Sequence, residues 1–230
     1  MAHGAEGVAA FLDLDRTLLS VNSGRLWVMR ERRVGRLGML KTAKAGVFLV
    51  LYHFGLVDME RVLEEALATV KGLPEDTVRE WTRQWFRDEV VSHEAPGARA
   101  WIDAHRAAGH LLVLLTSSSP YATECAVEHF GLDAGLSMRY GVEGGRFTGQ
   151  CERPLCYAEG KVTLAERLAD ERGIDLARSY FYTDSATDLP MLLRVGHPRI
   201  VNPDPRLRIE ARSRGWPVID WTRPPALATP

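Results

Sequence analysis

Four stretches of this sequence carry side chains of the kinds that take part in catalysis. An acid pair, Asp13 and Asp15, follows a short apolar run. Thr116 follows a second apolar run, Lys161 stands near the start of an expected helix, and Asp184 follows a third run. The carboxyl ends of parallel strands meet at one edge of a sheet, which is where open α/β sheets bind ligands. We therefore expect these five residues to converge.

The acid pair needs compensation for its charge. Two carboxylates this close repel each other, and with ordinary pKa values of about 4 both would be ionised near neutral pH. A hard divalent cation relieves the repulsion, and Mg²⁺ takes one or two carboxylates together with water and phosphate oxygens. Asp184 can add a third carboxylate, and Lys161 can add a positive charge for phosphoryl oxygens. This set predicts a site for Mg²⁺ and a phosphate group.

The remaining groups suit transfer of a phosphoryl group. Thr116 offers a hydroxyl, and Ser117 and Ser118 offer backbone N–H groups where a helix is expected to begin, an arrangement that favours phosphate. Phosphoryl transfer depends mainly on positioning and charge neutralisation. One carboxylate can accept the group covalently, and a second can act as general acid and then as general base. Each motif alone is common in solvated loops and helix caps, so the prediction rests on their order and placement together.

The elements that must position these residues are read from hydrophobic periodicity and from glycine and proline. Residues 96 to 221 alternate between strands and helices, with one more strand at the start of the chain. We expect strands at residues 8–14, 110–116, 180–183, 199–201 and 217–220, a hairpin at 137–142 and 146–150, and helices at 97–108, 119–130, 159–172, 188–194 and 205–214. This alternation predicts an α/β fold with a Rossmann-like parallel sheet and helices on both faces.

Residues 21–94 show only helical spacing, with helices expected at 25–33, 37–52, 59–70 and 75–90. We therefore expect residues 1–20 and 95–230 to form the α/β core, and residues 21–94 to form an inserted all-helical cap. The apolar run at 47–57 could be the core of the cap, line a pocket for an apolar leaving group, or pair two subunits. Trp27, Trp81 and Trp85 are expected to be core residues.

Composition excludes several kinds of partner. The 230 residues carry a formal net charge of −1 and no basic block, so we expect no nucleic acid partner. The three cysteines are odd in number and lack metal-ligand spacing, which predicts free thiols in a reducing cytoplasm. The first residues do not form a signal peptide, and the longest apolar run is too short for a membrane span. A cytoplasmic protein is expected, and its oligomeric state is left open.

These residues resemble the haloacid dehalogenase superfamily, within it the subfamily IB phosphatases related to phosphoserine phosphatase. Asp13-Leu14-Asp15-Arg16-Thr17 resembles the first motif of that superfamily. Thr116, with Ser117 as the alternative, stands where the second motif has Ser or Thr. Gly160-Lys161 resembles the third motif, and the stretch from Asp184 through Asp188 to Leu192 resembles the fourth.

The resemblance implies roles for these residues. Asp13 would be the nucleophile and Asp15 the general acid and base. Mg²⁺ would be held by Asp13, the backbone carbonyl of Asp15 and Asp184, and Asp188 would support this metal site and Lys161. The phosphate-binding residues would be Thr17, which braces the loop, Thr116, Ser117, Ser118 and Lys161. The implied function is hydrolysis of a small phosphorylated metabolite, a phosphate monoester, through an aspartyl-phosphate; a phosphotransferase or a non-catalytic binding protein of this fold are the alternatives.

Two positions depart from the family pattern, and two more bear on the substrate. Arg16 and Thr183 stand where small residues are usual; Arg16 could add a cation to the entrance or be a plain surface residue. Asn22 stands where phosphoserine phosphatases carry a glutamate for the substrate ammonium, and Ala66 near their carboxylate-binding arginine. We therefore expect a substrate other than phosphoserine. Asn22, Ser23 and Arg25 could contact the substrate or cap the first helix of the insertion.

Overall fold

A six-stranded sheet forms the centre of the protein. The computed structural model describes residues 7–36, 38–39, 59–223, 225 and 227. The strands run in the order β3 (Ala134–Leu136), β2 (Leu111–Leu115), β1 (Ala9–Leu12), β6 (Tyr180–Thr183), β7 (His197–Val201) and β8 (Val218–Ile219). Every neighbouring pair is parallel. The chain thus starts at a central strand, adds β2 and β3 on one side, and then returns to the other side of β1.

Both faces of the sheet are covered, as the apolar strands predict. In β1, Ala10 and Leu12 belong to one core cluster, whereas Ala9 and Phe11 belong to the other. The first cluster includes side chains of α5 (Ala98–Ala107) and α6 (Pro120–Phe130). The second includes side chains of α7 (Glu159–Arg172), α8 (Leu189–Arg194) and α9 (Pro205–Arg214). The expected α/β fold with helices on both faces is confirmed.

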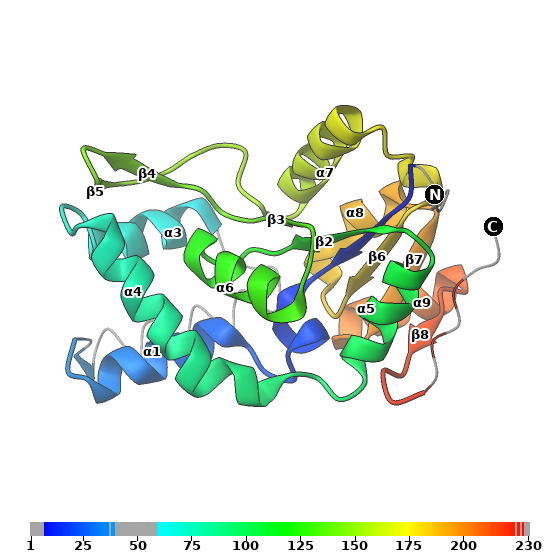
Figure 1. Ribbon diagram of the computed structural model, residues 1–230, viewed down its shortest axis with the longest axis horizontal. Coiled ribbons are helices and arrows are strands. Elements are labelled where there is room, and N and C mark those ends of the chain that lie inside the picture. Colours follow the sequence, from blue (N-terminus) through cyan, green and yellow to red (C-terminus); the bar gives the residue numbers. More distant parts are fainter. Residues whose placement is uncertain (1–6, 37, 40–58, 224, 226, 228–230) are drawn as a thin grey trace.

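α-Helices occupy the described part of the chain between β1 and α5. These are α1 (Ser23–Arg33), α3 (Met59–Ala68) and α4 (Glu75–Trp85). They gather at one end of the molecule, beside the β4–β5 hairpin and away from β7 and β8 (Figure 1). The helix expected at 75–90 is interrupted, because a π-turn at Phe86–Val90 and a 3₁₀ turn at Val91–His93 follow α4. The wider turn lets Trp85, Phe86 and Val90 enter the same core cluster.

Trp85 is buried and Trp27 and Trp81 are half-buried. The apolar run at 47–57 lies outside the described residues.

The hairpin of β4 (Tyr140–Glu143) and β5 (Arg146–Cys151) joins the helical insertion through its backbone. Phe147 N–H donates to the carbonyl of Leu73 at 3.1 Å, and Gly72 N–H donates to the carbonyl of Phe147 at 2.9 Å. The hairpin was predicted, but its first strand begins at Tyr140 and not at residue 137. Met138 N–H instead donates to the carbonyl of Ser118, which ties this segment to the sheet edge.

One strand was not predicted, and the expectation for the cysteines holds. β3 is only three residues long and includes the exposed Gly135, so it carries no apolar pattern. The three cysteines, Cys125, Cys151 and Cys156, are free, as expected. Within the described part of the chain, every helix is too short or too polar to reach across a bilayer.

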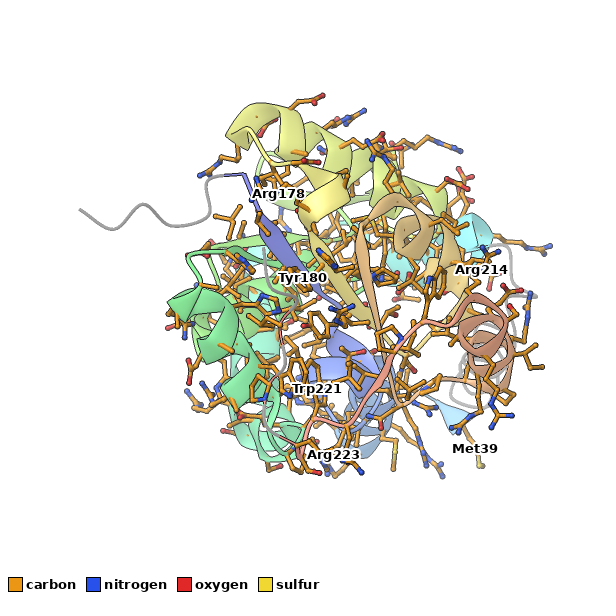
Figure 2. All side chains as sticks on the ribbon, turned by 90° about the vertical axis from the view of Figure 1, so that its right-hand side faces the viewer. Met39, Arg178, Tyr180, Arg214, Trp221 and Arg223 are labelled. Carbon is orange, nitrogen blue, oxygen red and sulfur yellow. The ribbon has the colours of Figure 1, made fainter. Side chains whose placement is uncertain are left out.

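A histidine and aromatic cluster packs beneath β6 and the segment after β8. His105 is fully buried; its Nδ1 lies 2.7 Å from Nδ1 of His110, and its Nε2 lies 2.8 Å from the hydroxyl of Tyr182. The ring of Trp221 stacks on Tyr182 with centroids 5.2 Å apart. Tyr180 and Trp221 lie on the same side of the molecule (Figure 2). Burial, reinforced by His110, lowers the pKa of His105 to about 3.

This shift makes stability depend on pH. Between a pKa of about 6.5 in the unfolded chain and about 3 in the folded protein, the unfolded chain binds a proton at His105 that the folded protein does not. The free energy of unfolding should therefore fall as the pH drops through this window, by up to about 1.4 kcal/mol per pH unit. Urea unfolding at several pH values should show a flatter profile for His105→Gln than for wild type. An unchanged slope would contradict this role of His105.

Candidate active site

Three of the predicted residues stand at the ends of three neighbouring strands. Asp13 follows β1, Thr116 follows β2, and Asp184 follows β6. β1 lies between β2 and β6 in the sheet, and the chain reverses its direction of strand addition at β1. Asp13 N–H donates to the carbonyl of Tyr182 at 2.9 Å, which extends the pairing of β1 with β6 by one residue. Asp13, Thr116 and Asp184 therefore lie at one edge of the sheet, at the point where the strand order reverses and where open α/β sheets bind ligands.

Lys161 joins the acids through two hydrogen bonds. Its Nζ lies 2.9 Å from Oδ1 of Asp13 and 2.9 Å from Oδ2 of Asp188. The lysine is 2% exposed, and Asp13 and Asp188 are also buried. Because a buried charge is costly without partners, a lysine bridging two carboxylates is a strongly determined arrangement. The structure thus brings together residues from three distant stretches of the chain, as the sequence predicted.

Gly160 explains how Lys161 reaches this position. A Cβ added to Gly160 would lie 1.8 Å from the carbonyl oxygen of Leu155, so only glycine fits against that backbone. Ala158, which precedes α7, has a φ of 47°, and this turn sets the direction of the first helical residues. The third motif therefore needs glycine at position 160, because the start of α7 passes too close to the Leu155 backbone for a side chain.

Thr183 contributes a contact that its sequence position did not reveal. The sequence marks it only as a departure from the usual glycine. Its hydroxyl donates to Oδ2 of Asp188 at 2.6 Å and accepts from the backbone N–H of Ser185 at 3.2 Å. Asp188 is thus held by Thr183 and by Lys161 on the same oxygen. A hydroxyl at the end of an apolar strand is the signal that could have identified this role.

Asp15 lies at the N-terminus of α1. Its Oδ1 accepts from the backbone N–H of Ser23 at 2.9 Å, and the Asn22 side chain accepts from Arg25 N–H, capping the helix. The Oγ atoms of Ser23 and Ser118 are 3.5 Å apart, and Arg25 is exposed. Of the three possible substrate residues, Asn22 therefore caps the helix and Ser23 contacts Asp15. No contact places Arg25 in the site among the described residues.

The other predicted phosphate-binding residues surround the strand ends. The hydroxyl of Thr116 is buried and accepts from Ser118 N–H at 3.2 Å, whereas the Ser117 hydroxyl donates to the Cys156 carbonyl at 2.7 Å. Thr17 is fully buried, and its Oγ1 has no hydrogen-bond partner among the described residues. The predicted bracing of the loop by Thr17 is therefore not seen as a side-chain hydrogen bond among the described residues.

Asn202 and Asp204 hold two of the site's loops and were noted in the sequence only as part of the closing motif stretch. Asn202 Nδ2 donates to the carbonyl of Arg16 at 3.1 Å. Asp204 accepts from Ala186 N–H at 2.7 Å, while its own N–H donates to the carbonyl of Asp184 at 2.8 Å. The signal for Asp204 was its place before Pro205, because it also caps α9.

The electrostatics of the acids fit a divalent cation. Burial raises the pKa of Asp13 to about 7, although Lys161 opposes the shift. Burial, and then the charge of Asp13, raise the pKa of Asp184 to about 8, and burial raises the pKa of Asp15. Among the described residues, no group of three or more His, Cys, Asp and Glu side chains is arranged to hold a metal ion by itself. Asp13 and Asp184, whose raised pKa values indicate incompletely compensated charge, suit Mg²⁺, which takes one or two carboxylates and keeps several waters, better than a metal that needs a full protein cage.

The sequence is similar to those of known hydrolases. A family model for haloacid dehalogenase-like hydrolases matches residues 10–193. The "Inhibition of morphological differentiation protein" of Streptomyces azureus is 34% identical, over 96% of this chain and 81% of its own length. A "Probable phosphatase" of Mycobacterium tuberculosis is 32% identical over 95% of this chain and 77% of its own length. A "Histidinol-phosphatase" of Neisseria meningitidis is 30% identical over 92% of this chain and 98% of its own length.

Two solved structures share the fold. A protein of unknown function from Bordetella pertussis superposes with a TM-score of 0.85 and 30% identity, covering 94% of this chain and 99% of that one. A phospho-aspartyl intermediate analogue of phosphoserine phosphatase gives a TM-score of 0.68 at 21% identity, covering 89% of this chain and 90% of that one. At that identity the second similarity concerns the fold alone.

Replacing Thr183 by valine tests the contact with Asp188. Valine has nearly the same shape but leaves a buried carboxylate oxygen without its hydroxyl donor, so the free energy of unfolding should fall by about 1–3 kcal/mol. Thr183→Ser retains the hydroxyl and should lose less. Denaturant unfolding of both variants and wild type measures the difference. If valine were tolerated as well as serine, the hydroxyl would not support Asp188.

Proposed function

The chain belongs to the haloacid dehalogenase-like hydrolases, and on that basis we propose that it is a magnesium-dependent phosphatase acting on a small phosphate monoester. The observation that carries the proposal is the buried Lys161 between Asp13 and Asp188, at the strand edge where Asp184 also lies. Asp13, the carbonyl of Asp15 and Asp184 would hold Mg²⁺. When bound, the ion would offset the negative charge of the acids and of the phosphate oxygens.

In the first step, Asp13 attacks phosphorus and the bond from phosphorus to the leaving oxygen breaks. The product is an aspartyl-phosphate on Asp13. Asp15 donates a proton to the departing alkoxide, which leaves as an alcohol. A raised pKa favours the protonated form of Asp15, and the Ser23 N–H keeps Oδ1 in a fixed direction. Lys161 and the Thr116 hydroxyl provide positive charge and a donor for the phosphoryl oxygens.

In the second step, the aspartyl-phosphate is hydrolysed. Asp15, now ionised, takes a proton from a water molecule as the water oxygen attacks phosphorus. The bond from phosphorus to the Asp13 oxygen breaks, which releases inorganic phosphate and restores the Asp13 carboxylate. Asp188, held by Thr183, supports the reaction by keeping the Lys161 ammonium beside Asp13.

The helical insertion would act as a cap over this site. Residues 1–20 and 95–230 would form the core, and residues 21–94 would form the cap. Two backbone bonds lie at the junction: Ser20 N–H donates to the carbonyl of His93 at 2.8 Å, and Ala95 N–H donates to that of Leu18 at 2.8 Å. The Ser23 contact with Asp15 then links the first cap helix to the proposed acid. A cap that limits access of bulk water would strengthen the electrostatic interactions within the site during phosphoryl transfer.

Phosphoserine is not expected to be the preferred substrate. Asn22 carries no charge, and its side chain is engaged in capping α1. Ala66 is exposed on α3 and also lacks the charge needed for a substrate carboxylate. A relative of nearly the same length is named a histidinol-phosphatase, which makes an amine-bearing alcohol phosphate a useful candidate to test.

Replacing Asp13 by asparagine tests the nucleophile. The amide cannot form the acyl phosphate, so release of phosphate from p-nitrophenyl phosphate with Mg²⁺ should fall by about a thousandfold or more. Asp170→Asn, at an exposed position on α7, is the matched control and should keep wild-type activity. EDTA should remove the activity of wild type and control alike. Wild-type turnover by Asp13→Asn in a clean preparation would refute the assignment.

A panel of phosphate esters tests the substrate class. We expect kcat/KM for phosphoserine to be well below that of the best ester, by about tenfold or more, because the two charged groups that hold its ammonium and carboxylate are absent. Histidinol phosphate, sugar phosphates and p-nitrophenyl phosphate belong in the panel. Release of inorganic phosphate measures each rate. A preference for phosphoserine would overturn this part of the proposal.

A further inference from the structure

Arg16 is a charged residue of the first motif that the proposed reaction does not use. It lies between Asp15 and Thr17 with a φ of 57°, in the left-handed region. Its N–H donates to the carbonyl of Val21 at 3.0 Å, and its carbonyl accepts from Asn202 Nδ2 at 3.1 Å. Because both peptide groups are tied to other parts of the fold, the backbone that carries the Arg16 side chain is held in one place.

The side chain of Arg16 reaches Asp184, on the loop after β6. Its Nε lies 3.2 Å from Oδ2 of Asp184; the arginine side chain is 42% exposed and the aspartate side chain 8% exposed. Lys161, another cation at this edge, already contacts Asp13 and Asp188. Arg16 therefore brings a partly solvated positive charge onto one oxygen of a nearly buried carboxylate.

We propose that Arg16 lowers the affinity of the site for divalent cations, because it shares Asp184 with the cation. The inference rests on the proposed metal site of Asp13, the Asp15 carbonyl and Asp184. A guanidinium on a metal ligand places a positive charge close to a dication, and the two repel each other even with strong screening. Arg16 also occupies an oxygen of the Asp184 carboxylate, which the ion needs as a ligand. When cations are scarce, Arg16 offsets part of the negative charge of Asp13, Asp15 and Asp184.

If Arg16 served only to orient Asp184, removing Arg16 would weaken metal binding and not strengthen it. If the ion pair served to aim Asp184 at the cation, its loss would weaken binding, as loss of a ligand's outer hydrogen bond commonly does. The loop of Asp184 has other supports, since Asp204 N–H donates to the Asp184 carbonyl at 2.8 Å and Asp204 accepts from Ala186 N–H. This support does not depend on Arg16, so we expect the charge effect to dominate.

Arg16→Gln is the test variant, because glutamine removes the charge and meets the same left-handed backbone cost as arginine. EDTA-stripped protein is titrated with Mg²⁺ by calorimetry and with Mn²⁺ by electron paramagnetic resonance. We expect the dissociation constant of Arg16→Gln to be about tenfold lower than that of wild type. Arg16→Lys keeps the charge and should remain within about threefold of wild type.

Unfolding without metal provides a second readout. In EDTA, Arg16→Gln should unfold at a lower denaturant midpoint than wild type, since Asp184 loses its cationic partner. Saturating Mg²⁺ should raise the midpoint of Arg16→Gln by more than it raises that of wild type. Neither measurement requires turnover, so both report on the ion pair itself.

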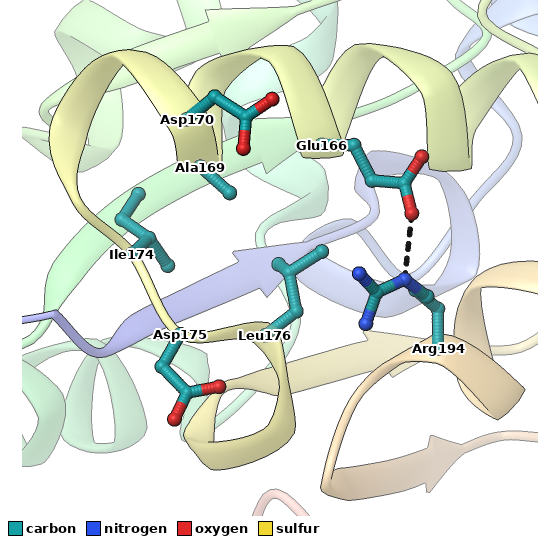
Figure 3. Close-up of a pocket in the computed structure, with 7 residues that line it drawn as sticks. All are labelled: Glu166, Ala169, Asp170, Ile174, Asp175, Leu176 and Arg194. Carbon is teal, nitrogen blue, oxygen red and sulfur yellow. Dashed lines mark hydrogen bonds and ion pairs between the residues drawn. The ribbon is translucent and has the colours of Figure 1, made fainter.

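Arg194→Gln is the matched control. Arg194 is 44% exposed, and its Nε lies 2.7 Å from Oε1 of Glu166, an ion pair similar to that of Arg16. The pair lies on the wall of a separate pocket lined by residues of α7, α8 and the turn before β6 (Figure 3). Loss of this arginine should leave the affinity for Mg²⁺ and Mn²⁺ unchanged.

The outcomes separate this inference from the proposed function. If wild type binds the ions and Arg16→Gln binds them equally or more weakly, the role of Arg16 is overturned and the metal site stands. If wild type binds neither ion, and its phosphate release does not depend on Mg²⁺, the proposed function fails and the inference fails with it. Tighter binding by Arg16→Gln, with Arg194→Gln unchanged, supports both.

Discussion

The candidate site depends on one buried ammonium group. Lys161 is almost inaccessible to solvent, and its two short hydrogen bonds to Asp13 and Asp188 are what make burial of three charges possible. Removing any one member would leave the others without compensation in a medium where solvation is weak. Much of the surrounding structure follows from this requirement, from the glycine that lets α7 begin against the Leu155 carbonyl to the threonine that holds Asp188.

The sheet supplies the rigid frame for that arrangement. Its three central strands end side by side, so the residues after them are fixed by backbone pairing and not by their own side chains. Two core clusters clamp the sheet from opposite faces, which leaves little freedom for the strand ends to shift. A site that must hold charged groups to within a fraction of an ångström is well served by such elements.

The helical insertion is connected to this frame at more than one place. Leu18 and Ser20 pair with Ala95 and His93 where the chain leaves and re-enters the core, and Ser23 meets the Asp15 carboxylate. On the other side, the β4–β5 hairpin bonds to the turn at residues 72–75. A change in the position of the insertion would therefore act on Asp15 directly, through the first turn of α1. This is the physical link between the cap and the proposed acid.

The sequence by itself determined the strand and helix order, because apolar runs and capping residues are local signals, and it identified Asp13, Lys161, Asp184 and Asp188 as one set. It could not predict β3, a three-residue strand with an exposed glycine at its centre that depends on pairing with β2. Nor could it distinguish Thr183 as a partner of Asp188, or Arg16 as a partner of Asp184, from neutral substitutions. Those contacts join residues whose distance is set by the packing of loops, and only tertiary structure decides which oxygen a long side chain reaches.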